Sequence, residues 1–292
     1  MSRGGIADRI AGAPISWGVC EVPGWGHQLA PERVLREMRE VGLAAAEFGP
    51  DGFLPTDPTL KAQTLAGHGL AAVGGFVPVV AHDVGHDPLP EVDAALDGFV
   101  AAGAGVLVLA AATGLDGYDE RPVLGADGWK TLCSNLDRLA VLAQERGVQA
   151  CLHPHVGTMV EARDDVYRLL DGARLPLCLD TGHLFVGGTD PAALAREVPG
   201  RVAHTHLKDV DGALAESVRA GRRTYTEAVR AGMYRPLGRG DVDIADIVRT
   251  LEAHGYQGWY VMEQDTVLDA EPEGAGPLLD VAASVAYLRG LE

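Results

Sequence analysis

Short apolar runs recur along the chain at intervals that are too long for β-hairpins. Continuous apolar runs of this length are typical of strands that are buried on both faces of a parallel sheet. The pattern predicts eight strands, at residues 11–16, 44–48, 71–77, 105–110, 148–152, 175–180, 202–207 and 258–263.

Amphipathic stretches lie between these runs. Residues 31–41, 130–146, 190–198 and 243–254 place apolar side chains at helical spacing, and several of these stretches end before a glycine. Alternating strands and helices, with no linker rich in Pro, Gly or Ser, favour one (β/α)8 TIM barrel of the α/β class over residues 1–292. A doubly wound open sheet is the alternative, but no GxGxxG motif follows the first predicted strand.

One segment breaks this alternation, between the seventh predicted strand and the last predicted helix. Residues 211–242 are longer than an ordinary connection in a barrel. A long loop after a barrel strand lies over the active-site face, so this insertion is either a lid or partner contact, or a solvated helix. The insertion is rich in arginine, with Arg219, Arg222, Arg223, Arg230, Arg235 and Arg239.

The charge balance narrows the range of partners. The sequence has 24 Lys and Arg against 41 Asp and Glu, which gives a net charge of −17 with histidine neutral. This excess of acid repels a phosphate backbone and an anionic membrane surface. We therefore expect a small-molecule substrate, with neither nucleic acid nor membrane as a partner. The arginine-rich insertion could form the interface of a homo-oligomer.

The cysteines and the apolar segments indicate a cytoplasmic protein. Four cysteines stand at positions 20, 133, 151 and 178 without a CxxC pair, so neither a disulfide scaffold nor a cysteine-based zinc site is expected. Cys151 and Cys178 lie inside apolar runs and are predicted to be buried thiols. There is no long apolar segment near the N-terminus, and no run of ~18 apolar residues anywhere.

Polar side chains gather where the predicted strands end. In a barrel, the carboxyl ends of the strands meet around one mouth, so these residues are expected to lie close together. Half of the ten histidines belong to this set. Its members are Glu47, His153, His155, Asp180, His183, His204, His206, Lys208, Asp209, Glu263 and Asp265.

Imidazoles and carboxylates that converge on one point are ligands for a divalent cation such as Mn²⁺, Co²⁺, Fe²⁺ or Zn²⁺. His204 and His206 share a strand face, and His206 lies nearer the mouth, so His206 is the expected ligand and His204 an inner-layer residue. Asp180 ends its strand and should also be a ligand, whereas His183 lies in the following loop and could touch substrate. A serine hydrolase is not indicated, because no GxSxG motif occurs.

Three of these segments carry a family resemblance: LDTGH at residues 179–183, HTHLKD at 204–209 and VMEQD at 261–265. They resemble the sugar isomerase/epimerase superfamily of xylose isomerase-like barrels, and within it the inosose dehydratase group. Further segments match in order along nearly the whole chain, at residues 13–17, 46–55, 153–158 and 236–243.

The resemblance implies one divalent metal, bound in that superfamily through Glu, Asp, His and Glu. Asp180, His206 and Glu263 match three of these positions, and His153 stands where the isomerases have a glutamate. This departure favours dehydratase-like members and leaves His155 as the reserve for the first ligand. The metal implied is Mn²⁺ or Co²⁺, with Fe²⁺, Zn²⁺ or Mg²⁺ as alternatives.

The resemblance also implies a substrate of the keto-cyclitol or keto-sugar class. A metal ion would polarise the carbonyl and stabilise an enediolate, while side chains move protons. Glu47, His155, His183 and Lys208 are the candidate acids and bases, and partial burial is expected to raise the pKa of Glu47. Structural alternatives are a Glu47 carboxylate bonded to loop N–H groups and a rim salt bridge from Lys208 to Asp209 or Asp211. The substrate-binding candidates are Trp17, Phe53, His183 and Lys208, with Trp25 as a further loop aromatic.

Three functions remain open at this point. The first is a metal-dependent hydro-lyase, most like the dehydration of inosose (2-keto-myo-inositol). The second is an isomerase or epimerase on the same scaffold, such as a ketose 3-epimerase or an inosose isomerase, with β-elimination of a 3-keto-glycoside as a related reaction. The third is a binding subunit that retains the metal site without catalysis.

Overall fold

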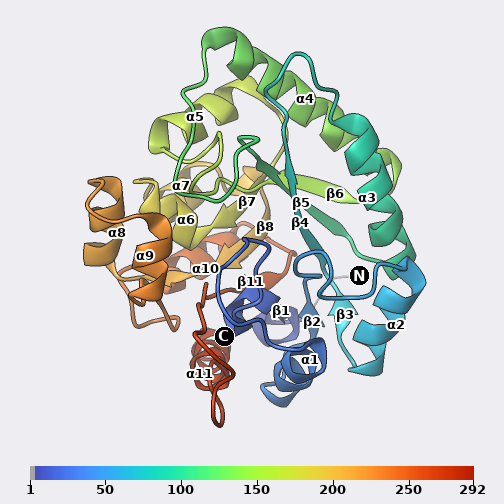
Figure 1. The fold of residues 1–292 in the computed structure, drawn as a ribbon, viewed down its shortest axis with the longest axis vertical. Coiled ribbons are helices and arrows are strands. Elements are labelled where there is room, and N and C mark those ends of the chain that lie inside the picture. Colours follow the sequence, from blue (N-terminus) through green and yellow to red (C-terminus); the bar gives the residue numbers. More distant parts are fainter. Residues whose placement is uncertain (1–3) are drawn as a thin grey trace.

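The computed structural model describes residues 4–292, which form a barrel of parallel strands surrounded by helices (Figure 1). Each neighbouring pair of strands in the main sheet is parallel. The sheet runs in the order β3 (Ala71–Ala72), β2 (Ala45–Ala46), β1 (Ile10–Gly12), β11 (Tyr260–Met262), β8 (Val202–Leu207), β7 (Leu177–Asp180), β6 (Gln149–Leu152), β5 (Val106–Ala111) and β4 (Gly74–Val79).

The barrel is closed through a single residue, Val73. β3 and β4 stand at opposite ends of the strand order, but only Val73 separates them in the chain. Val73 N donates to Ala46 O at 3.0 Å, and Gly105 N donates to Val73 O at 3.0 Å, so Val73 joins the neighbours on both sides. β3 and β4 are therefore two halves of the third barrel strand. The prediction of one (β/α)8 barrel is confirmed.

The helices pack around the barrel, and the four predicted helices are present with ends shifted by a few residues. α1 shows why they form, since Val34, Leu35 and Met38 recur on its buried face. The surrounding helices are α1 (Pro31–Glu40), α2 (Pro58–Gly67), α3 (Leu89–Ala102), α4 (Ala126–Glu145), α5 (Arg163–Gly172), α6 (Thr181–Val186), α7 (Pro191–Glu197), α10 (Ile244–Ala253) and α11 (Leu278–Arg289), with 3-10 turns η1 (Ile6–Arg9), η2 (Pro14–Trp17) and η3 (Pro199–Arg201).

The first strand is shorter than predicted. It ends at Gly12, and residues Pro14–Trp17 form a 3-10 turn instead of continuing to position 16. Proline has no backbone N–H, so Pro14 cannot donate to the strand ladder and its fixed φ suits the first position of a helical turn. This turn carries the side chain of Trp17 away from the barrel mouth.

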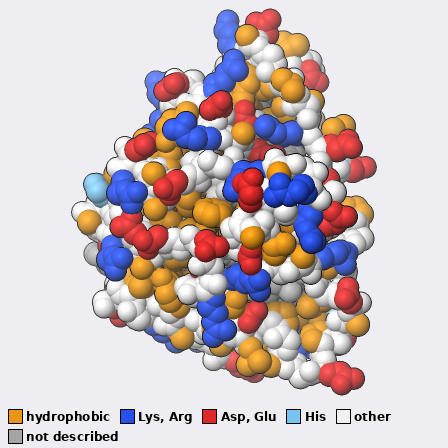
Figure 2. All heavy atoms as spheres, turned by 90° about the vertical axis from the view of Figure 1, so that its left-hand side faces the viewer, with side chains coloured by type: hydrophobic (Ala, Val, Ile, Leu, Met, Phe, Trp, Pro, Cys, Tyr) orange, Lys and Arg blue, Asp and Glu red, His pale blue; other side chains and the backbone are white. Residues whose placement is uncertain are grey.

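The insertion after the seventh barrel strand folds into two short helices and a strand pair. α8 (Gly212–Arg219) and α9 (Tyr225–Arg230) lie on the left of Figure 1. β10 (Tyr234–Arg235) pairs antiparallel with β9 (Asp209–Val210), which comes just before the insertion. Figure 2 shows this side of the molecule, where basic side chains are interspersed with acidic ones. Arg230 donates to Trp25 O at 2.6 Å, so the insertion reaches the loop that follows the first strand.

Asp209 holds the end of this insertion in place. Its carboxylate is fully buried and accepts hydrogen bonds from the backbone N–H groups of Gly238, Gly240 and Val242 at 2.8, 2.9 and 3.1 Å. A buried carboxylate that accepts several backbone N–H groups fixes the loop around it. Asp209 is thus a structural residue, although it follows the strand that carries site residues.

The burial predicted for Cys151 and Cys178 is confirmed, since both side chains are fully buried. All four cysteines are free thiols. Among residues 4–292, no helix combines the length and the apolar character that a membrane span requires.

Candidate metal centre and active site

Four predicted ligands meet at the carboxyl ends of neighbouring strands. His153 Nε2 lies 3.0 Å from Asp180 Oδ2, and His206 Nδ1 lies 3.6 Å from the same oxygen. Glu263 Oε2 lies 3.3 Å from His206 Nδ1. The register explains this proximity, because Asp180 on β7 pairs directly with His206 on β8, and β11 follows on the far side of β8. All four side chains are buried.

The donor set fits a divalent ion. His153 Nε2 and His206 Nδ1 are buried atoms with no hydrogen-bond partner among the described residues, and Asp180 Oδ2, which lies near both, is paired with the Lys208 ammonium at 3.1 Å. Buried polar atoms are nearly always paired, so a group of unpaired ones facing each other indicates a missing partner. One ligand atom from each of His153, Asp180 and His206 lies within 4.8 Å of the other two. Two imidazoles and two carboxylates are the usual donors for Mn²⁺, Co²⁺ or Zn²⁺.

The two imidazoles of this cluster differ in their tendency to bind a proton. Burial lowers the pKa of His153 to about 4, so this imidazole is neutral at pH 7 and keeps a lone pair for a metal. Burial also lowers the pKa of His206, but the nearby carboxylates of Glu263 and Glu47 more than offset it and raise that pKa above the ordinary value. A proton and a metal ion therefore compete for His206 Nδ1.

A second group, formed by Glu47, His204 and His206, is less suited to an ion. Glu47 Oε1 accepts hydrogen bonds from His204 Nε2 at 2.9 Å and from His206 Nε2 at 3.0 Å. A carboxylate can only accept, so both Nε2 atoms carry protons and offer no lone pair. The expected rise in the pKa of Glu47 is wrong: burial raises it, but His206 and His204 together hold it well below its ordinary value.

Lys208 places a positive charge inside the same cluster. Its Nζ lies 3.1 Å from Asp180 Oδ2, 2.8 Å from Glu263 Oε2 and 3.1 Å from Asp265 Oδ1. Burial disfavours the ammonium, but the three carboxylates more than compensate and raise the pKa of Lys208. The alternative of an exposed salt bridge to Asp209 or Asp211 is wrong, because Lys208 is only 2% exposed and faces the barrel interior.

His155 and His183 have different positions. His155 lines the central cavity, and its Nδ1 lies 2.6 Å from the carbonyl oxygen of Val156, which makes Nδ1 the protonated nitrogen and Nε2 the acceptor. Burial lowers the pKa of His155 well below the ordinary value. His183 does not line that cavity: its ring lies behind His155, with centroids 3.7 Å apart, and Val156 N donates to its Nδ1 at 3.4 Å. His183 thus lies outside the lining of this cavity, and its contact with substrate stays a prediction.

Two predicted aromatic contacts are also absent from the cavity. Trp17 is fully buried, and its Nε1 donates to Glu37 Oε2 on α1 at 2.8 Å, because the turn at Pro14 directs the indole into the core. Phe53 packs beside Gly49 and does not reach the cavity. Sequence reasoning could not separate these loop aromatics from true cavity residues, since both kinds follow barrel strands.

Two tyrosines that sequence reasoning missed cover the site. Tyr118 follows β5, and its ring centroid lies 4.4 Å from that of His155. Tyr225 comes from α9 of the insertion and donates to Asp265 Oδ2 at 2.6 Å. Both line the cavity together with Trp25. The sequence indicates these tyrosines only by their position in long loops after strands. In barrel enzymes such loops lie over the active site.

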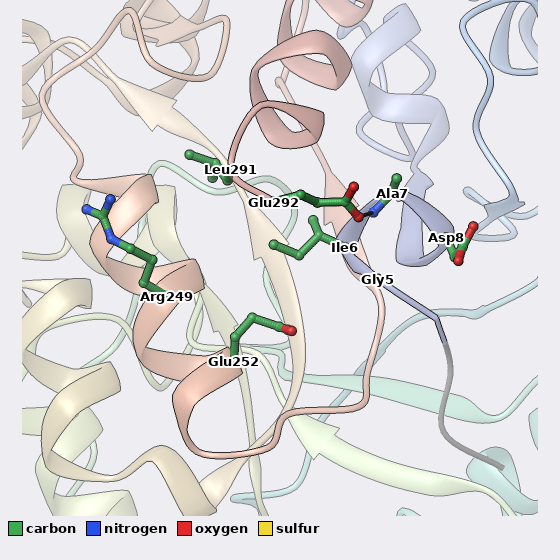
Figure 3. Close-up of a pocket in the computed structure, with 8 residues that line it drawn as sticks. All are labelled: Gly5, Ile6, Ala7, Asp8, Arg249, Glu252, Leu291 and Glu292. Carbon is green, nitrogen blue, oxygen red and sulfur yellow. Dashed lines mark hydrogen bonds between the residues drawn. The ribbon is translucent and has the colours of Figure 1, made fainter.

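The cavity at the barrel mouth has a volume of about 420 Å³. Its polar end is formed by Glu47, His153, His155, His206, Lys208, Glu263 and Asp265. A second cavity of about 720 Å³ lies at the opposite end of the barrel (Figure 3), lined by Gly5, Ile6, Ala7, Asp8, Arg249, Glu252, Leu291 and Glu292. It faces the amino ends of the strands, where barrel residues serve stability, and it holds none of the clustered ligands.

Sequence comparison assigns the family. Residues 35–289 match the model of the xylose isomerase-like TIM barrel. The chain belongs to this family. It is 28% identical over 288 residues to the inosose dehydratase of Geobacillus thermodenitrificans, covering 95% of both chains. It is 32% identical over 282 residues to the rhizopine catabolism protein MocC of Rhizobium meliloti, covering 92% of this chain and 84% of that protein.

Solved structures share the fold at lower sequence identity. An L-ribulose 3-epimerase superposes with a TM-score of 0.68 at 15% identity, covering 97% of this chain and 94% of that one. The IolI protein with a bound zinc atom superposes with a TM-score of 0.67 at 13% identity, covering 97% and 96%. These similarities confirm the barrel fold.

Proposed function

We propose that the protein is a divalent-metal-dependent hydro-lyase that removes water from a keto-cyclitol or keto-sugar, in a reaction most like that of inosose dehydratase. Its curated relatives and structural neighbours indicate an enzyme that acts on sugars or cyclitols. The observation that carries the proposal is the meeting of His153, Asp180, His206 and Glu263, with unpaired buried donor atoms, at the end of a cavity.

These four side chains would hold the ion. When bound, the ion supplies a Lewis acid that polarises a carbonyl group. The zinc atom in the IolI structure supports a divalent metal in this fold, and Mn²⁺ or Co²⁺ is our expectation. Glu47 fits a positioning role here, because its carboxylate fixes the ring of His206 through Nε2 and directs Nδ1 toward Asp180 and Glu263.

The acid and base are assigned from their environments. His155 is neutral and presents Nε2 as an acceptor in the cavity, so we assign it to take the proton from the carbon beside the substrate carbonyl. Lys208 is an ammonium, so we assign it to donate a proton to the departing hydroxyl group. The C–H electron pair forms the new double bond, the C–O bond breaks, and water leaves. Opposite protonation states in one cavity are what such a reaction requires.

An epimerase is the second candidate, favoured by the fold similarity to L-ribulose 3-epimerase. It would use the same proton removal by His155 but would return the proton to carbon rather than expel a hydroxyl group. The metal positions are common to both reactions, so they do not discriminate between them.

The test is incubation of the Co²⁺-loaded chain with inosose, followed by absorbance of the enone product and by NMR in deuterium oxide. A dehydratase gives the chromophore, whereas an epimerase incorporates deuterium into recovered ketose without it. An Asp180→Ala variant, which removes a ligand, is the control for activity from contaminants. A wild-type chain that gives neither signal contradicts both candidates.

A further inference from the structure

The cavity at the barrel mouth does not end at the polar cluster. It continues between residues 49–51, which follow β2, and Phe76, Val77 and Pro78 of β4. From there it reaches the outer side of the third barrel strand, under helices α2 and α3, which pack against each other on the right of Figure 1. The polar cluster and this side groove are therefore two parts of one space.

The walls of the side groove are mostly apolar and aromatic. Phe48 and Phe99 stand edge to face with ring centroids 5.1 Å apart. Val77 and Lys61 also line the groove, and the Lys61 ammonium lies 4.8 Å from the centre of the Phe48 ring. Aromatic rings pack favourably in edge-to-face and offset geometries, so a planar ring is well suited to this space.

Small residues keep the groove open on the side of α3. Ala95 and Gly98 are three residues apart, so they share a face of the helix, and both line the cavity. A Cβ atom added at Gly98 would meet no atom within 4 Å. Leucine or another large residue at these positions would occupy the space, so the groove depends on their small size.

The volume exceeds the needs of a bare ring substrate. A pocket of about 420 Å³ falls in the class of ~300–1,000 Å³ that encloses most of a drug-sized ligand. A keto-cyclitol is a single six-membered ring with hydroxyl groups, and most of its polar partners lie at the cluster end. The groove end is mainly aromatic and aliphatic, with Asp51 and Lys61 as its charged members.

We propose that the side groove binds an aromatic substituent carried by the substrate, so that the enzyme accepts an aryl-substituted keto-sugar or keto-cyclitol. The proposal rests on the proposed function for the reacting ring, which lies at the polar cluster. The aryl group passes between residues 49–51 and β4 and packs against Phe48 and Phe99. The same cavity is lined by His153, Lys208 and Glu263 of the polar cluster, which ties this occupant to the substrate rather than to a separate ligand.

The test is a binding measurement that does not depend on turnover. The Co²⁺-loaded full chain is titrated calorimetrically with phenyl β-D-glucoside and with methyl β-D-glucoside, which differ only in the substituent. The comparison is repeated with Gly98→Leu, which fills the groove and suits a helix better than glycine. Ala94→Leu is the matched control, since Ala94 is exposed on the same helix.

The phenyl compound should bind at least tenfold more tightly than the methyl compound, since even one methylene group in an apolar pocket changes affinity about 10- to 200-fold. Gly98→Leu should abolish this preference while the methyl compound binds as before, and Ala94→Leu should keep it. Equal or undetectable binding of the two compounds, or a preference that survives Gly98→Leu, overturns the proposal. A preference for phenyl without any conversion of inosose would instead contradict the proposed reaction and leave the groove assignment standing.

Discussion

Replacement of Glu47 by glutamine tests whether this carboxylate positions the metal ligand His206. The variant keeps the size of the side chain but removes the negative charge that accepts N–H from His206 at 3.0 Å and from His204 at 2.9 Å. A hydrogen bond to a charged group contributes about 1.5–3 kcal/mol. Loss of the carboxylate partner of a metal-bound histidine typically weakens metal binding about 10- to 100-fold. We therefore expect Co²⁺ to bind Glu47→Gln about 10- to 100-fold more weakly, or about 1.4–2.7 kcal/mol.

The assay is isothermal titration of Co²⁺ into each variant, with folding checked by circular dichroism. Glu37→Gln is the matched control, because Glu37 is also buried and accepts two hydrogen bonds, from Trp17 and Arg33, but lies in the packing of α1. Its Co²⁺ affinity should stay within about twofold of wild type. Equal Co²⁺ affinity in Glu47→Gln and wild type would refute the positioning role.

Three further predictions follow from the same contacts. Lys208→Met should lower kcat about 10²- to 10⁴-fold with a smaller change in KM, because it removes the proton donor. If the variant instead loses both substrate affinity and folding stability, Lys208 has a structural role. Trp17→Phe should lower the free energy of unfolding by about 1–3 kcal/mol in urea denaturation, because the Glu37 carboxylate loses a buried donor. The kcat of this variant should stay unchanged. A selective loss of substrate affinity would show that Trp17 contacts the substrate. Asp209→Ala should free the backbone N–H groups that it binds and raise amide exchange across residues 236–242; unchanged exchange there would contradict its structural role.

The meeting of the site residues could be predicted from the sequence because the topology of a barrel brings the carboxyl ends of all its strands to one mouth. Once the apolar runs are assigned as parallel strands, Asp180 and His206 must face the same mouth, and the spacing of two between His204 and His206 puts them on one face. The order of the strand ends along the chain is also their order around the barrel, so no long-range contact had to be known in advance.

The parts that could not be predicted depend on contacts between distant residues. The pKa of Glu47 is set by histidines that lie 157 and 159 positions later in the chain, and burial alone gave the wrong direction. The indole of Trp17 finds its partner on α1 through a turn that interrupts the predicted strand. Tyr225 reaches the site from an insertion without periodicity, where a sequence pattern does not indicate which side chain points inward.

The most direct test of the account is anomalous diffraction from crystals of the Co²⁺-soaked protein. We predict one strong peak per chain among His153, Asp180, His206 and Glu263, with Nδ1 of His206 as a ligand at about 2.0–2.3 Å. A peak among Glu47, His204 and His206, or the absence of a peak at the barrel mouth, would contradict the assignment of the metal centre on which the proposed function rests.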